Sequence, residues 1–205
     1  MSTEHFNIYY YEEERYVAEI AARSAEQSYT RLTRKFNHEI FSPIPLVIYS
    51  SPMYFAQTNT SSGLIPESTL GFTEFLKGRM VLPFTGSFAD FDHVIRHELV
   101  HVFTLSKLAR VQKNQRSIKQ TLPPLWFIEG LAEHWSTDWD TQGDMLVRDM
   151  VISGQIVGIP EFWRIRGSFL MYKFGQSVCQ FIEEEYGEDK ITMIFENWWK
   201  SGKFG

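Results

Sequence analysis

The stretch that decides the fold is residues 90–104, which read Asp-Phe-Asp-His-Val-Ile-Arg-His-Glu-Leu-Val-His-Val-Phe-Thr. Its apolar residues recur at helical spacing, which predicts a helix running through a core. Ser87 precedes it as a candidate N-cap, and Asp90 lies in the first turn, where an acidic side chain is favoured. His97 and His101 are four residues apart and therefore lie on one face of the expected helix.

The pattern His97-Glu98-x-x-His101 is the spacing by which a helix offers two histidines to one zinc ion, with the glutamate acting as general base. The flanking residues are apolar, as expected for a ligand helix inside a core. The alternative is a helix whose two histidines are ordinary core residues. Because a third ligand follows in the sequence, the pattern favours the metal.

A zinc site that keeps one position open for water needs a third protein ligand. Residues 123–135, Pro-Pro-Leu-Trp-Phe-Ile-Glu-Gly-Leu-Ala-Glu-His-Trp, predict a second helix after two prolines. Glu129 and Glu133 lie one turn apart on it. We expect Glu129 to ligate the metal and Glu133 to accept a hydrogen bond from a ligand histidine, which fixes the tautomer of that ring. For Glu133, an exposed helix carboxylate is the alternative.

These two motifs resemble those of the gluzincin metallopeptidases, the group of thermolysin and the zinc aminopeptidases, whose third ligand is a glutamate on a second helix. Most of the chain is also similar to the compact peptidase MA-like domain that precedes a TolB-like β-propeller in some large bacterial proteins. The stretches that carry this similarity, in the same order, are residues 5–10, 71–74, 77–86 and 89–93. One departure is a long spacer between the two zinc motifs.

The resemblance implies a zinc-dependent peptide hydrolase that holds one Zn2+ and cleaves a peptide or protein substrate. It leaves open whether the protease acts as an aminopeptidase or an endopeptidase. It also implies a C-terminal β-propeller in the full-length protein and a periplasmic, envelope or secreted location. Two alternatives remain: a zinc-binding interaction domain that has lost turnover, and a structural envelope component in which the metal only joins two helices.

The same resemblance suggests residues around the reacting atoms. Aminopeptidases of this group place a tyrosine, which donates to the oxyanion, three residues before a glycine that opens a later helix. At that place, before Gly167, this chain has Arg164, and Tyr172 or His134 is the alternative donor. These enzymes bind the substrate's free amine with a glutamate on a strand ahead of the zinc helix. Glu74 stands in the comparable position, or is an ordinary strand carboxylate in a hairpin.

Strand patterns precede the decisive stretch, and helical patterns follow it. The strands expected are 6–11, 45–49, 72–76 and 79–84, with a helix over 12–38 after the first. The last two form either a hairpin or two separate strands of the sheet, and we expect 79–84 to be the sheet edge that pairs with an extended peptide. Further helices are expected over 145–153, 167–186 and 189–199. In the helix over 167–186, we expect Phe169, Phe174 and Phe181 to face inward.

This order indicates the α+β class. The resemblance makes the fold zincin-like, with an N-terminal mixed β-sheet, an active-site helix packed on it and a mostly helical C-terminal part. The length of 205 residues, of which 43% are apolar, predicts a single domain over 1–205. The aromatic end of the sequence resembles a cut before a following domain, so we expect a fragment of a longer protein.

Charge and hydropathy exclude some classes of function. A formal net charge of −5 argues against a nucleic-acid binder. No apolar run is long enough to span a membrane, and no signal peptide is visible. A basic residue recurs at every third position in part of the spacer: Lys107, Arg110, Lys113, Arg116 and Lys119. These five side chains form either a solvated basic face or a lid that favours anionic substrates.

Overall fold

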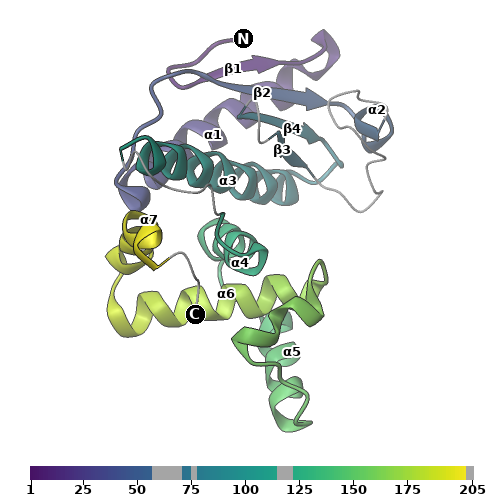
Figure 1. Ribbon diagram of the computed structural model, residues 1–205. Coiled ribbons are helices and arrows are strands. Elements are labelled where there is room, and N and C mark those ends of the chain that lie inside the picture. The colour runs from purple at the N-terminus through teal and green to yellow at the C-terminus, as the bar shows by residue number, and fades with distance from the viewer. Residues whose placement is uncertain (57–70, 75–77, 115–121, 202–205) are drawn as a thin grey trace. The chain divides into compact units, whose positions relative to one another are not determined.

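The structure is a computed structural model that describes residues 1–56, 71–74, 78–114 and 122–201 (Figure 1). The chain divides into two compact units, Met1–Lys107 and Leu108–Gly205. The single domain over 1–205 stays a prediction. Within the described residues, no helix is both long enough and apolar enough to cross a membrane.

The first unit is built on a four-stranded mixed sheet. The strands are β1 (Phe6–Tyr9), β2 (Ile44–Tyr49), β3 (Phe72–Glu74) and β4 (Arg79–Pro83), in the spatial order β1-β2-β4-β3. The strands β1, β2 and β4 run parallel to one another, and β3 pairs antiparallel with β4. A strand therefore lies at each of the four expected places, and the last two pair antiparallel as in a hairpin, while residues 75–76 of the expected strand 72–76 lie outside the described residues.

The prediction that residues 79–84 form the edge of the sheet is wrong. The strand β4 pairs with β2 on one side and with β3 on the other. The strand β4 is buried from Met80 to Pro83, as expected for an inner strand. Its backbone groups are used within the sheet, so β4 has none to offer a peptide along its length.

Alternation along β2 shows which face of the sheet carries the core. Ile44, Leu46 and Ile48 are buried, whereas the residues between them are half-buried. The helix α1 (Arg15–Phe36), preceded by the 3-10 turn η1 (Glu12–Glu14), connects β1 to β2, and the short α2 (Pro52–Ala56) follows β2. The expected helix over 12–38 is confirmed.

The decisive stretch forms α3 (Phe88–Asn114), as predicted. Its first turn is capped as expected, because the backbone N–H of Asp90 donates to the Ser87 hydroxyl at 3.3 Å. The helix packs on α1 through Phe103, whose ring lies 5.2 Å from that of Tyr29 and 5.5 Å from that of Phe36. This packing anchors the helix that carries the two histidines.

The second unit is helical over its described residues. Its elements are α4 (Leu125–Ser136), α5 (Thr141–Ile152), η2 (Ile159–Ile165), α6 (Phe169–Tyr186) and α7 (Asp189–Ser201). Together with the sheet of the first unit, they confirm an α+β protein whose C-terminal part is mostly helical. The helices α4 and α6 cross at Gly130 and Gly175, where a Cβ atom on Gly130 would collide with the backbone of Gly175.

This crossing also corrects the predicted inward face of α6. Phe174 is buried as expected, but Phe169 and Phe181 are 51% and 53% exposed. The buried face instead carries Met171 and Cys179, which lie on the same side of α6 as Gly175. Two glycines in contact set the rotation of the helix, and apolar spacing alone did not reveal that contact.

Candidate metal centre

The two histidines of α3 lie side by side, as their spacing predicts. The Nε2 atoms of His97 and His101 are 3.2 Å apart, and the rings are nearly perpendicular, at 79°. Two nitrogens bound to one tetrahedral zinc ion at about 2.0–2.1 Å lie roughly 3.3–3.4 Å from each other. The observed separation therefore fits two ligands of one ion, and it also allows one ring to donate a hydrogen bond to the other.

Glu98 is a buried carboxylate with few partners to offset the cost of removing it from water. The residue is only 6% exposed, and its Oε2 accepts a hydrogen bond from the Thr73 hydroxyl at 2.7 Å. Among the residues that the structure describes, no lysine or arginine pairs with Glu98. A buried carboxylate without a positive partner is costly, so a cation near α3 would stabilise this arrangement.

Two groups of histidine and glutamate side chains are able to hold a metal ion. The first group is His97, His101 and Glu129, and the second is His93, His97 and Glu133. The first group is the set of ligands predicted from the sequence. The second adds His93, which the sequence analysis missed although it precedes His97 by the same four-residue spacing.

Glu133 and Asp140 share a positive partner, Lys173, within the second unit. Lys173 is only 4% exposed, and its Nζ lies 3.7 Å from a Glu133 oxygen and 3.2 Å from an Asp140 oxygen. Asp140 also caps α5 by accepting from the backbone N–H of Gly143 at 2.6 Å. This capping hydrogen bond, with a smaller contribution from Lys173, holds the pKa of Asp140 below its ordinary value.

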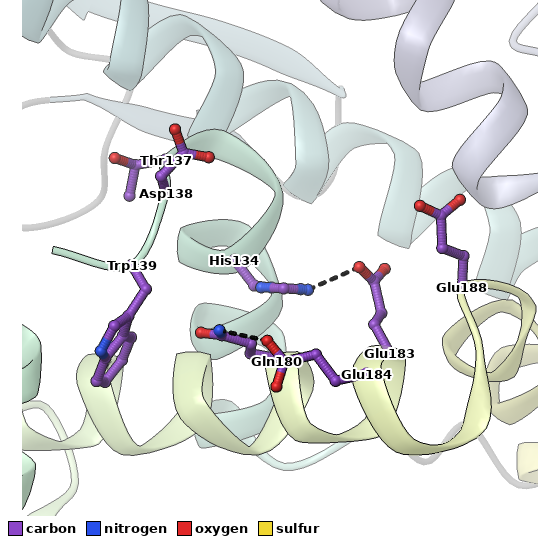
Figure 2. A pocket seen from close by; sticks show the side chains of 8 residues that line it. All are labelled: His134, Thr137, Asp138, Trp139, Gln180, Glu183, Glu184 and Glu188. Atoms are coloured by element: carbon purple, nitrogen blue, oxygen red, sulfur yellow. Dashed lines mark hydrogen bonds and ion pairs between the residues drawn. The ribbon is translucent and has the colours of Figure 1, made fainter.

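His134, an alternative oxyanion donor, is engaged by Glu183. Its Nε2 lies 2.9 Å from Glu183 Oε2, and Trp135 Nε1 donates to the other oxygen of Glu183 at 2.6 Å. This pair lies at a pocket of about 300 Å³. Figure 2 shows the side chains that line the pocket. The pocket is lined by His134, Thr137, Asp138, Trp139, Gln180, Glu183, Glu184 and Glu188. Glu183 thus orients the imidazole of His134.

The remaining predicted catalytic and substrate-binding residues lie on other elements. Arg164, on η2, is exposed, and its Nη1 donates to Glu161 at 3.4 Å. Tyr172 is half-buried on α6. Glu74 ends β3 and accepts from Arg79, its partner in the β3–β4 register, at 2.9 and 2.5 Å. The catalytic and substrate-binding roles of these residues stay predictions.

The basic residues of the spacer do not share one environment. Lys107 is 5% exposed, and its Nζ donates to the backbone oxygen of Asn37 at 3.5 Å, so it does not belong to a solvated face. Arg110 and Lys113 are exposed on α3. Residues 116 and 119 lie outside the described residues, and a lid role for the segment stays a prediction.

Comparison with known proteins adds no relative to this picture. No protein-family model matches the chain, and a search of curated proteins gives no significant match. The resemblance to gluzincin metallopeptidases and to the domain ahead of a TolB-like propeller stays a prediction.

Proposed function

We propose that the chain is a zinc-dependent metallopeptidase of the gluzincin type. His97, His101 and Glu129 would hold one Zn2+, with Glu98 as the general base. The observation that carries the proposal is the 3.2 Å separation between the Nε2 atoms of His97 and His101. Glu98 lies between these two histidines in the sequence of the same helix, and it is buried. Two imidazoles and one carboxylate are a donor set that catalytic zinc uses in other peptidases.

The charge balance supports the same proposal. The Glu98 carboxyl group is buried, and its hydrogen-bond partner among the described residues is the neutral hydroxyl of Thr73. Zinc would bring the positive charge that the described residues around Glu98 do not supply. When bound, the ion would act as a Lewis acid, which polarises the scissile carbonyl and lowers the pKa of a bound water.

The residues of the chain then divide the remaining work. Glu98 takes a proton from the attacking water and passes it to the leaving amine. Glu133 orients a ligand imidazole by accepting a hydrogen bond from it. Arg164, Tyr172 or His134 donates to the oxyanion of the tetrahedral intermediate. If the enzyme is an aminopeptidase, Glu74 binds the free amine of the substrate.

The experiment is hydrolysis of a peptide library by the zinc-loaded chain and by its Glu98→Gln variant. We expect the substitution to lower turnover by roughly 10²–10⁴-fold, the usual contribution of a general base, while the zinc content stays unchanged. Glu19→Gln, at an exposed glutamate of α1, is the matched control. Cleavage at the same rate by Glu98→Gln, or no cleavage by the zinc-loaded wild type, would contradict the proposal.

Blocking the amino terminus of the best substrate separates exopeptidase from endopeptidase action. An aminopeptidase loses activity on the acetylated peptide, and Glu74→Gln then weakens binding of the free peptide. An endopeptidase cleaves both peptides equally.

A zinc-binding interaction domain without turnover is the second candidate. The observation that favours it is that Glu74 and Arg164, the residues assigned to substrate, form ion pairs with Arg79 and Glu161. Such a domain would bind zinc through the same three ligands and cleave nothing. It would present an attached β-propeller in the cell envelope to partner proteins.

A further inference from the structure

We propose that Thr73 is a positioning residue for Glu98. Its hydroxyl holds one carboxylate oxygen, Oε2, and leaves Oε1 to take the proton of the attacking water. This inference rests on the proposed function, because it gives Glu98 the part of the general base. Thr73 is not among the site residues predicted from the sequence, although it directly precedes Glu74.

The contact between the two side chains is buried and short. Thr73 is 5% exposed and Glu98 is 6% exposed, and their oxygens are 2.7 Å apart. A hydroxyl that donates to a carboxylate typically lies about 2.5–2.7 Å from it, so the distance fits a charge-assisted hydrogen bond. The Thr73 oxygen also lies 3.1 Å from the backbone oxygen of Glu98, which places the hydroxyl directly against this turn of α3.

The sheet fixes the position of the hydroxyl. Thr73 pairs with Met80 in the β3–β4 ladder, and a β-branched side chain has little freedom about its first torsion. Gly71 allows β3 to approach α3 this closely. A Cβ atom there would lie 2.5 Å from Leu82 Cδ2, 2.8 Å from Val94 Cγ1 and 3.4 Å from Glu98 Cγ. Thr73 is therefore a rigid donor rather than a mobile one.

A rigid donor is useful to a general base because proton transfer requires a carboxylate already in place. In the described part of the chain, Thr73 is the hydrogen-bond partner of the Glu98 side chain, and Oε1 has none. Holding Oε2 removes the rotational freedom of the carboxylate, and misplacement of a catalytic group by about 1 Å can lower a rate by roughly 100-fold.

The activity test compares Thr73→Val with Thr73→Ser in the zinc-loaded chain. Valine keeps the shape of threonine and removes the hydroxyl, whereas serine keeps the hydroxyl. We expect Thr73→Val to lower kcat by roughly 10–100-fold with KM and zinc content unchanged. Thr73→Ser should restore most of kcat. A kcat for Thr73→Val equal to that of wild type, or a loss that serine does not restore, would overturn the proposal.

A second readout does not depend on activity. Thermal unfolding of the metal-free chain is followed for Thr73→Val, Glu98→Ala and the double variant. Coupled side chains give a shift in the midpoint for the double variant that differs from the sum of the two single shifts. Additive shifts would mean that the two side chains do not interact, and the proposal would fail.

The two failures are distinguishable. If the zinc-loaded wild type cleaves no peptide, the proposed function fails, and the catalytic role of Thr73 fails with it whatever the unfolding cycle gives. If the wild type cleaves and Thr73→Val cleaves as fast, only the role of Thr73 is lost.

Discussion

Three buried or half-buried glutamates have different partners in the two units: Glu133 and Glu183 in one, and Glu98 in the other. In the unit Leu108–Gly205, Glu183 is approached by His134 and Trp135, and Glu133 lies 3.7 Å from the buried Lys173. In the unit Met1–Lys107, Glu98 is bound by one neutral hydroxyl. In the second unit, neighbouring side chains therefore offset the charge of the glutamates. The described residues around Glu98 bring no positive charge to it. Because of this difference, we expect the proposed cation to bind near Glu98 on α3.

Removing the internal cation of the second unit should have the largest effect on stability. Lys173→Met leaves Glu133 and Asp140 without their positive partner. We expect the free energy of unfolding to fall by about 2–3 kcal/mol, less than for a fully buried pair because Asp140 is half exposed. Urea denaturation measures this change. Lys190→Met, which removes an exposed pair with Asp189, is the control and should change nothing measurable.

A smaller loss is expected when Glu183 is neutralised. Glu183→Gln replaces an acceptor of two hydrogen bonds by a group with one acceptor oxygen, which should cost about 1–2 kcal/mol in the same denaturation experiment. The neighbouring exposed Glu185→Gln is the control. Equal stability of Glu183→Gln and wild type would show that Glu183 is not held by its partners.

Neutralising Glu98 in the metal-free chain should act in the opposite direction. A buried amide is less costly than a buried carboxylate without a positive partner, so Glu98→Gln should raise the free energy of unfolding by up to about 1 kcal/mol. The measurement is made after treatment with a chelator. If Glu98→Gln destabilises the chain as much as Glu183→Gln does, the contrast between the two units is wrong.

The smallest expected effect is on the stability of the chain at acidic pH. The pKa of Asp140 is lowered in the folded chain by the Gly143 N–H and, to a lesser extent, by Lys173. The stabilisation is therefore present above the pKa of an unfolded aspartate, about 3.9, and is lost as the pH falls through the lower folded value. We expect Asp140→Asn to be less stable at neutral pH and to lose less stability on acidification below about pH 4. Parallel pH profiles of the two proteins would contradict this linkage.

Sequence patterns predicted the elements better than their arrangement. Helices and strands appeared where the apolar spacing indicated, because burial on one face imposes a local period on the sequence. The central position of β4 depends on its pairing with β2, which is distant in the chain. The rotation of α6 depends on Gly130 and Gly175 meeting, which again joins distant residues.

The same limit applies to the candidate site. The spacing of His97, Glu98 and His101 is local, so the sequence sufficed to place them on one helix. His93 shows the same spacing and was available to the same reasoning. Thr73 was not, because its contact with Glu98 joins residues that are 25 positions apart on different elements.

Calorimetric titration of Zn2+ into the chelator-treated chain tests the central claim most directly. The account predicts one ion per chain, and an affinity lowered by roughly 100-fold or more in His101→Ala and in Glu129→Gln, since even residues that only orient a ligand can be worth 10–100-fold. His134→Gln, a histidine outside both ligand groups, should bind as the wild type does. No binding by the wild type, or unchanged affinity in His101→Ala, would contradict the account.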